Sequence, residues 1–239
     1  VGIRYDEAAT LAQSLSRFRN LQVTGLMTHF AVADDPEQTA FTRLQIERFD
    51  HVCDEFRRAG HEPEIFDLAN SPGALSHPES RGNMVRLGGA LYGLLDDIMR
   101  DATSLPDLKP VLSLRSCVAQ VKRVPQGESL GYGRTFTTER DSLIALVPIG
   151  YADGYSRRLS NKGKAIVNSS IVPVVGRVSM DWTLLDVTDV GNVTVNDEVI
   201  FIGSDEHNAI TAADLARDLD TIGYEITCRI SSRVPRVFK

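Results

Sequence analysis

The chain has 239 residues, 42% of them hydrophobic, which is enough to bury the core of one large domain or two ordinary ones. A net charge of −6 argues against a nucleic-acid-binding surface, and no apolar run approaches the roughly 20 residues that span a bilayer. Cys53, Cys117 and Cys228 lack the spacing of a disulfide framework or a metal site. We therefore expect buried thiols in a cytoplasmic protein, with small polar substrates still open.

Alternating helices and strands are predicted for the first part of the chain. Apolar residues recur at helical spacing over 9–18, before a β-rich segment at 23–30. A long amphipathic helix follows and ends at Gly60, a residue typical of helix C-termini. Strands at 64–69 and 83–87 come next, and strands separated by such helices indicate a parallel sheet, either open or part of a barrel. The apolar face of the long helix consists of Phe41, Leu44, Phe49, Val52, Cys53 and Phe56.

The pattern changes after a polar connector at 96–110, where helical periodicity gives way to short strands separated by glycines. We place a domain boundary near Asp107, so that residues 1–107 form an α/β domain and residues 108–239 a mainly β domain. One helix is expected in the second domain, beginning at Thr211 with an acidic residue three positions later. The predicted strands span 111–124, 143–149, 165–167, 171–178, 182–187 and 198–202.

Two neighbouring clusters in the first domain suggest a phosphate site. One strand ends in Asn70 and Ser71, and the next ends in Gly88 and Gly89. This arrangement directs a hydroxyl and two unobstructed backbone N–H groups to one place, as the phosphate sites of barrel enzymes do. Two tight turns explain the same residues, and these residues alone favour that simpler explanation.

Aromatic and acidic residues accompany glycine in two clusters of the second domain. Tyr132 lies between two glycines, which suits a loop that approaches a ligand and equally suits a hairpin. Tyr151 lies in a similar segment, 150–154. Met180 and Asp181 follow a valine-rich strand, where a solvated strand end is a simpler explanation than a substrate contact.

Taken in order, these motifs resemble the alanine racemase family. The resemblance implies a (β/α)8 barrel followed by a mainly β domain, with roughly the last three barrel strands present here. It also implies pyridoxal 5'-phosphate at the barrel mouth and an active site completed across a head-to-tail homodimer. The matching segments are Val1-Gly2, Thr28-His-Phe-Ala31, Ala69-Asn-Ser71, Val85-Arg86, Gly131-Tyr-Gly133, Gly150-Tyr-Ala-Asp-Gly154, Val178-Ser-Met-Asp181, Thr221-Ile-Gly-Tyr-Glu225 and Arg233-Val-Pro-Arg236.

The same resemblance assigns residues to the cofactor. Arg86 would face the pyridine nitrogen, where a guanidinium that keeps its proton favours reprotonation at Cα over transamination. A structural ion pair is the alternative for Arg86. Asp67 stands where many family members have histidine, and we expect it to pair with Arg86 and hold it as a cation. The other implied cofactor-binding residues are Ser71, Gly88, Gly89 and Tyr224 at the phosphate, with His29 and Asn70 beside the ring.

Racemisation needs a proton acceptor on one face of Cα and a donor on the other. The resemblance makes Tyr132 one of these bases and assigns the other to a lysine on an early barrel strand, which binds the cofactor covalently. None of the lysines of this chain lies in that motif, so we expect the chain alone to be inactive. Met180 would contact the substrate carboxylate through its N–H, while Tyr151 and Asp181 would line the path of the substrate.

Three interpretations remain open at this point. The first is the interconversion of L- and D-alanine, which supplies D-alanine for peptidoglycan. The second is a related racemase that acts on serine or on a broader set of amino acids. The third is a non-catalytic dimerisation fragment, which the missing lysine favours.

Overall fold

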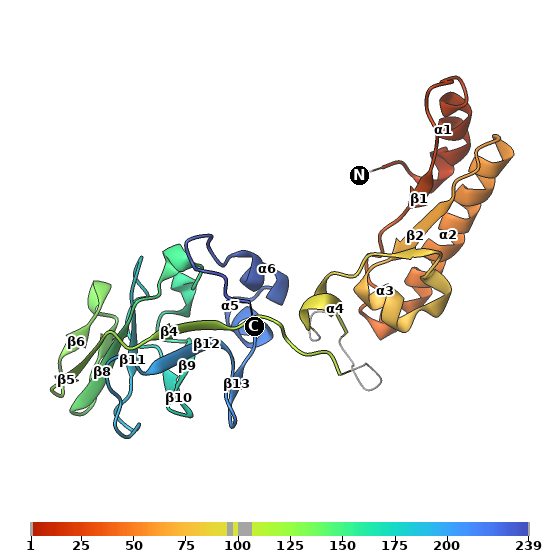
Figure 1. The fold of residues 1–239 in the computed structure, drawn as a ribbon. Helices are drawn as coiled ribbons and strands as arrows, with labels where there is room; N and C mark the ends of the chain where they lie inside the picture. Colours follow the sequence, from red (N-terminus) through yellow and green to blue (C-terminus); the bar gives the residue numbers. More distant parts are fainter. Residues whose placement is uncertain (1, 95–97, 100–106, 239) are drawn as a thin grey trace. The chain divides into compact units, whose positions relative to one another are not determined.

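The computed structural model describes residues 2–94, 98–99 and 107–238 (Figure 1). The chain divides into two compact units, Val1–Leu108 and Lys109–Lys239, called unit 1 and unit 2 below. The first and last residues and most of the expected polar connector lie outside the described residues. Within the described ranges, every helix is too short or too polar to traverse a lipid bilayer.

Unit 1 is built on a three-stranded parallel sheet with the order β1-β2-β3 (Figure 1). The predicted parallel pairing is present, with Leu26 opposite Phe66 in the first strand pair. The strands are shorter than the segments expected at 23–30 and 83–87. At the first of these, Thr28 makes a last hydrogen bond to β2 and the chain then leaves the sheet. The strands are β1 (Gly25–Met27), β2 (Ile65–Ala69) and β3 (Met84–Val85).

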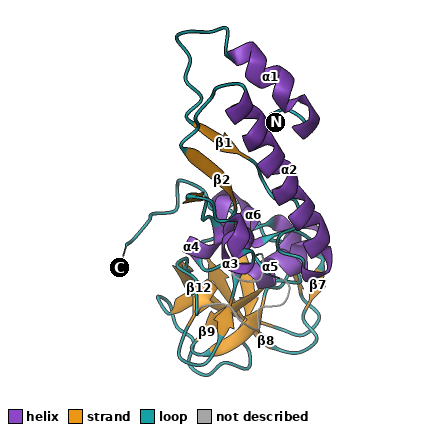
Figure 2. Ribbon diagram, turned by 90° about the vertical axis from the view of Figure 1, so that its right-hand side faces the viewer, coloured by secondary structure: helices purple, strands orange, loops and turns teal. Residues whose placement is uncertain are grey.

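A long helix, α2, packs against the sheet of unit 1 (Figure 2). It buries Phe49 and Cys53 in a cluster that includes Leu68 of β2. The helix ends as predicted: Gly60 has a φ of 85° and its N–H donates to the carbonyl of Arg57, which is the geometry that favours glycine. The helices of unit 1 are α1 (Ala8–Leu15), α2 (Thr39–Arg58), α3 (Ser71–Ser76) and α4 (Gly89–Tyr92), with 3-10 turns at Tyr5–Glu7, Pro36–Gln38 and Pro78–Ser80.

Three apolar residues assigned to helix faces are exposed instead. Phe18 lies beyond the end of α1, because that helix stops at Leu15. Phe41 and Leu44 lie in the first turns of α2 but outside its buried stripe. The stripe begins at buried Thr42, which precedes Phe49 by two helical turns, so a polar residue takes the core position there.

Unit 2 is mainly β, and all its strand pairs are antiparallel. One sheet has the order β10-β9-β12-β13 with β4 beside β12, a second has the order β11-β8-β5, and β6 and β7 form a hairpin. The strands are β4 (Leu114–Cys117), β5 (Gln120–Val124), β6 (Ser129–Leu130), β7 (Phe136–Thr137), β8 (Ser142–Val147), β9 (Lys164–Val167), β10 (Ser170–Pro173), β11 (Thr183–Asp186), β12 (Glu198–Ser204) and β13 (Ala209–Ile210).

The core of unit 2 contains the apolar run of β12, whose residues 199–202 are all buried. A continuous apolar run of this kind indicates a strand covered on both faces. The single strand expected at 111–124 is in fact two strands in different sheets. The chain changes sheets at Val118 and Ala119, whose N–H groups donate to Asp197 and Leu146 respectively.

Two helices follow the strands of unit 2, and only the first was expected. Thr211 caps α5 (Ala212–Leu219), because its hydroxyl accepts from the N–H of Asp214 and the Asp214 carboxylate accepts from Thr211 in return. The second helix, α6 (Gly223–Cys228), starts after Asp220 takes a left-handed conformation. It has six residues, too few for a clear periodic pattern. Short 3-10 turns complete the unit at Tyr132–Arg134, Tyr151–Asp153 and Arg157–Leu159.

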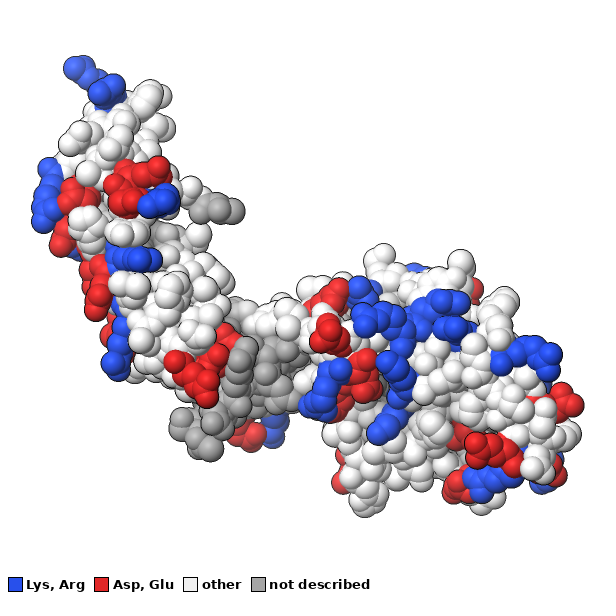
Figure 3. Space-filling model, turned by 180° about the vertical axis from the view of Figure 1, so that it is seen from behind, with Lys and Arg blue, Asp and Glu red and all other residues white. Residues whose placement is uncertain are grey.

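Charged side chains of both signs are intermixed on the face shown in Figure 3.

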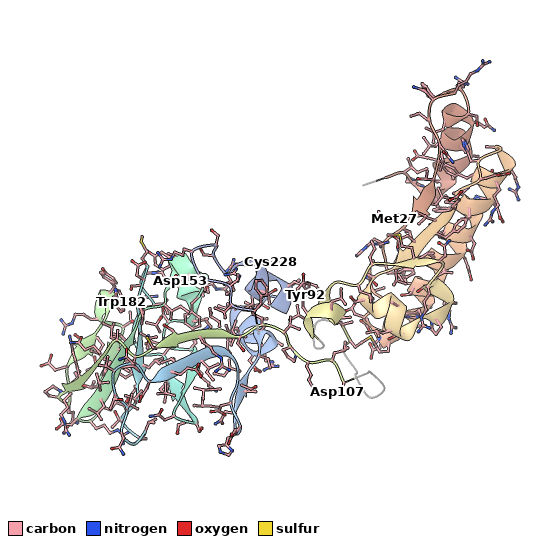
Figure 4. The ribbon with its side chains drawn as sticks, in the orientation of Figure 1. Met27, Tyr92, Asp107, Asp153, Trp182 and Cys228 are labelled. Carbon is pink, nitrogen blue, oxygen red and sulfur yellow. The ribbon has the colours of Figure 1, made fainter. Side chains whose placement is uncertain are left out.

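The cysteines differ from expectation, since only Cys53 is buried and Cys117 and Cys228 are exposed. Burial raises the pKa of the Cys53 thiol to about 11. The other two end their elements, β4 and α6, where side chains leave the core (Cys228 is labelled in Figure 4).

Candidate functional site

The buried hydroxyl of Ser71 joins the carboxyl ends of β2 and β3. Its Oγ accepts hydrogen bonds from the N–H of Gly88 at 2.9 Å and from that of Ala90 at 3.3 Å. A Cβ at Gly88 would meet no atom within 4 Å, so the backbone is open at that point. Gly89 begins α4, and the first N–H groups of a helix have no acceptor inside it. The structure therefore brings the Ser71 hydroxyl together with the N–H of Gly88, and with that of Ala90 in place of the Gly89 N–H that the sequence indicates.

Arg86 lies immediately after β3 and directs its two terminal nitrogens into the protein. Nη1 forms an ion pair with the buried carboxylate of Asp67, as the sequence predicts. Nη2 donates to the carbonyl of Thr28 at 2.8 Å. No described residue accepts from Nε, so one N–H of the guanidinium is free while the rest of the group is fixed.

His29 and Asn70 lie at the ends of neighbouring strands in unit 1. Nη2 of Arg86 contacts Nδ1 of His29 at 3.1 Å. Because a guanidinium only donates, Nδ1 accepts and the imidazole carries its proton on Nε2. Asn70 has a structural function, since its Oδ1 accepts from the N–H of Gly73 and caps α3. The carboxyl ends of β1, β2 and β3 thus form one polar cluster.

A cavity of about 530 Å³ opens beside β1, the edge strand of this sheet. Its lining is largely apolar and includes Met27, labelled in Figure 4, together with Phe41 and Phe49. His29 also lines it, whereas Arg86 and Ser71 do not. The cavity therefore borders the polar cluster without containing it.

In unit 2, Tyr132 is held at the tip of the β6–β7 hairpin, with 73% of its surface exposed. Gly131 and Gly133 both have a φ of 72°, a conformation that favours glycine and turns the chain sharply on either side of the phenol. No described residue hydrogen-bonds its hydroxyl. The hairpin interpretation of this motif is correct, and the exposed phenol leaves the approach to a ligand as a prediction.

Tyr151, Met180 and Asp181 come together in unit 2. The N–H of Tyr151 donates to the carbonyl of Ser179, and that of Ala152 donates to the carbonyl of Met180, both at 3.0 Å. Ser179 closes a turn, because its N–H donates to the carbonyl of Trp182 at 2.9 Å. Among the described residues, the N–H groups of Met180 and Asp181 at the centre of this turn have no partner.

Two residues of this cluster were not among the predicted site residues. Arg233 donates from Nε to Oδ1 of Asp153 at 2.7 Å and from Nη2 to Oδ1 of Asp181 at 2.6 Å. These contacts, that of Asp153 first, raise the pKa of the Arg233 guanidinium above its ordinary value. Arg233 and Asp153 both lie in motifs that the sequence analysis identified. Their contact could not be predicted from those motifs, because 80 residues separate them in the chain.

Tyr224 lies in the first turn of α6, half-buried, with its carbonyl accepting from the Thr227 hydroxyl at 3.0 Å. The resemblance groups it with Ser71, Gly88 and Gly89, but it belongs to the other unit. The predicted site residues are therefore divided between the two units. Unit 1 holds His29, Asn70, Ser71, Arg86, Gly88 and Gly89, and unit 2 holds Tyr132, Tyr151, Met180, Asp181 and Tyr224.

Comparisons with known proteins agree across both units. Residues 1–96 match the family model of the alanine racemase N-terminal domain, and residues 111–238 match that of the C-terminal domain. The alanine racemase of Geobacter sp. (strain M21) is 42% identical over 242 residues, a match that covers 100% of this chain and 63% of the relative.

Solved structures give the same result. The alanine racemase of Bacillus anthracis with bound L-Ala-P matches with a TM-score of 0.92 at 36% identity, over 100% of this chain and 61% of that one. The alanine racemase of Bartonella henselae with covalently bound pyridoxal phosphate matches with a TM-score of 0.85 at 29% identity, over 99% of this chain and 62% of that one. The chain thus spans about three fifths of the length of these relatives. On this evidence, the chain belongs to the alanine racemase family.

Proposed function

We propose that this chain supplies most of the cofactor-binding residues and one catalytic base of an enzyme that interconverts L- and D-alanine with pyridoxal 5'-phosphate. The observation that carries the proposal is the fixed Arg86 guanidinium with its free Nε–H, beside the Ser71 hydroxyl and the open Gly88 backbone. The names of the matched relatives support alanine as the substrate.

The polar cluster of unit 1 fits this cofactor chemically. Pyridoxal 5'-phosphate carries a dianionic phosphate and a pyridine nitrogen that can accept a hydrogen bond. Ser71 offers its hydroxyl and Gly89 its N–H as donors for the phosphate, while the N–H of Gly88 is held by Ser71 and no Cβ stands in the way at that residue. The free Nε–H of Arg86 is a donor suited to the ring nitrogen. Asp67 keeps the guanidinium charged and in place.

When bound, the cofactor withdraws electrons from the amino acid so that its Cα proton becomes removable. We propose that the phenol oxygen of Tyr132 exchanges that proton on one face of Cα. Its position on an open hairpin tip supports this role, because a substrate has access to the hydroxyl. The free N–H of Met180 binds the substrate carboxylate, and Tyr151 and Asp181 line the path to it.

The proposal includes a closed barrel and a homodimer. The edge of β1 supports the barrel. No described strand pairs with its outer edge, Met27 is 64% exposed there, and the cavity beside it is lined largely by apolar residues. Exposed Tyr132, Met180 and Trp182 in unit 2 support an active site completed by a second subunit. The exposed free thiols Cys117 and Cys228 support a reducing compartment such as the cytoplasm.

The test is chiral chromatography of alanine incubated with the natural polypeptide in which this sequence occurs, loaded with pyridoxal 5'-phosphate. We expect L- and D-alanine to interconvert to equal amounts, with a higher kcat/KM than for serine. The chain of 239 residues assayed alone is expected to be inactive, because the second base is missing from it. Preferential turnover of serine would reassign the substrate, and no turnover of any amino acid would contradict the proposal.

A further inference from the structure

We propose that Arg233 is a positioning residue that holds the turn at Met180 against the loop at 150–153. It thereby fixes the place of the Met180 N–H that receives the substrate carboxylate. The inference rests on the substrate-binding role proposed above for Met180. Arg233 belongs to the closing Arg-Val-Pro-Arg motif, for which that proposed function leaves no task.

Three segments that are distant in the sequence meet at the Arg233 guanidinium. Nε and Nη2 donate to the two carboxylate oxygens of Asp153 at 2.7 and 3.1 Å, a bidentate contact, and Nη2 also donates to Asp181 at 2.6 Å. Asp153 belongs to the loop, and Asp181 directly follows Met180.

The backbones of the loop and the turn are also in direct contact. A small shift of the loop would therefore move the turn. A Cβ at Gly150 would lie 2.4 Å from the carbonyl oxygens of Ser179 and Met180, so only glycine permits this approach. The N–H groups of Tyr151 and Ala152 donate to the same two carbonyls at 3.0 Å. The position of Met180 therefore depends on how firmly the loop is held.

The charges explain why an arginine is needed at this place. Asp153 has only 12% of its side chain exposed, and its Oδ2 also accepts from the N–H of Gly150. Asp181 brings a second carboxylate to the same guanidinium. Without the cation these two carboxylates would repel each other, and the turn would be driven away from the loop.

Arg233 acts through the backbone and does not itself contact the substrate in this scheme. The two identified partners of its guanidinium are carboxylates of the protein, whereas the free donor is the N–H of Met180. Loss of Arg233 should therefore weaken carboxylate binding without removing the base, Tyr132. A misplaced donor loses affinity steeply because hydrogen-bond strength depends on distance and angle.

The first experiment measures amide hydrogen exchange of Tyr151 and Ala152 in the cofactor-loaded natural polypeptide. In Arg233→Met we expect both amides to exchange at least about tenfold faster, equivalent to about 1.4 kcal/mol of lost protection. Arg233→Lys keeps the charge but not the bidentate geometry, so it should restore part of the protection. Arg140→Met is the matched control, because it removes an exposed ion pair to Asp189 elsewhere in unit 2.

The second experiment measures binding of acetate, a carboxylate without an amino group, to the same proteins. Trp182 adjoins the turn and is the only tryptophan of this chain, so replacing any other tryptophan of the natural polypeptide with phenylalanine makes its fluorescence the binding signal. We expect the Kd of acetate to rise about tenfold in Arg233→Met and to be unchanged in Arg140→Met. Acetamide, which has the same shape without the charge, controls for non-specific effects. The KM for alanine should rise more than kcat falls.

The outcomes separate this inference from the proposed function. Unchanged amide protection in Arg233→Met overturns it, as does faster exchange with unchanged acetate affinity. If Arg233→Met fails to fold, the same two measurements are made on Arg233→Lys and Asp181→Asn. Each of these variants weakens the contact between residues 233 and 181 and keeps a positive charge beside Asp153. Neither readout requires turnover. A protein that passes both tests but racemises no amino acid would therefore contradict the proposed function and leave the role of Arg233 intact.

Discussion

The two units each fix an arginine with carboxylates, but they use the guanidinium differently. In unit 1, Arg86 pairs with one buried carboxylate, turns both terminal nitrogens inward and leaves Nε–H free. In unit 2, Arg233 uses Nε itself, together with Nη2, to bind two carboxylates from different segments. Arg86 is 26% exposed and its partner 6%, against 47% for Arg233 with partners at 12% and 49%.

The difference shows that the function of an arginine depends on which of its N–H groups have no hydrogen-bond acceptor in the protein. A guanidinium with a free N–H and a buried counter-ion is a prepared donor for a ligand, whereas one engaged by two carboxylates is a connection between loops. On this basis we propose that unit 1 supplies the residues around the cofactor ring, and that unit 2 positions the substrate and one base. Each prediction below tests one part of that division.

The largest effect is expected for Tyr132→Phe in the natural polypeptide. Loss of a general base typically costs about 10²- to 10⁴-fold in rate. If Tyr132 serves only one face of Cα, release of the Cα hydrogen to D2O should fall by this factor for one alanine enantiomer and much less for the other. Cofactor affinity should not change, since the cofactor residues of unit 1 are untouched. Equal slowing for both enantiomers, measured by NMR, would remove Tyr132 from a one-sided role.

Arg86→Met should destabilise the protein more than Arg233→Met. The first leaves Asp67 buried and unpaired, which costs about 3–5 kcal/mol. The second leaves carboxylates whose side chains are 12% and 49% exposed, so water compensates part of the lost contact and the expected loss is smaller. Urea unfolding of both variants provides the comparison. Adding Asp67→Asn to Arg86→Met should recover much of the loss, and a failure to recover would show that burial of the carboxylate is not the cause.

Ser71→Ala should weaken pyridoxal 5'-phosphate binding about tenfold, because it removes one hydroxyl donor and also the acceptor that holds the backbone of Gly88 and Ala90 in place. The measurement is a titration of cofactor into cofactor-free natural polypeptide, followed by absorbance. Ser80→Ala is the matched control: Ser80 is buried in the same unit, but its hydroxyl donates only to Gly73 and His77 carbonyls. Similar weakening in both variants would contradict a direct contact with the phosphate.

The smallest effect is expected at the start of α5, away from both arginines. Thr211→Ala removes the helix cap and should lower the free energy of unfolding by about 1 kcal/mol. Thr211→Ser keeps the capping oxygen and should be close to neutral. The kcat and KM for alanine should be unchanged in both variants. A change in KM would show that the start of α5 also affects substrate binding, which we do not propose.

The features predicted correctly from the sequence are those that depend on a few neighbouring residues. The end of α2 at Gly60 and the cap of α5 at Thr211 follow from a few neighbouring residues, and both are present. The Asp67–Arg86 pair is also present, but it was expected from the family resemblance and not from a local pattern. By contrast, the division of the 111–124 segment between two sheets depends on partners at Asp197 and Leu146, which periodicity cannot reveal.

The same limit explains the residues that were missed in the site. Arg233 and Asp153 stood in quoted motifs, but their pairing spans 80 residues and no local pattern connects them. The spacing of apolar residues predicts a core position for Phe41 and Leu44, which are exposed. That spacing does not define which stripe of α2 faces the sheet. In each case the missing information is tertiary.

The central claim, that the ends of β1, β2 and β3 bind the cofactor, is tested most directly by NMR of the arginine Nε–H groups in the natural polypeptide. Without cofactor, the Nε–H of Arg86 should exchange rapidly with water, while that of Arg233 is protected by Asp153. On addition of pyridoxal 5'-phosphate, the Arg86 signal should shift and become protected, and the Arg233 signal should stay as it was. An Arg86 Nε–H that is unaffected when the cofactor is fully bound would contradict the account.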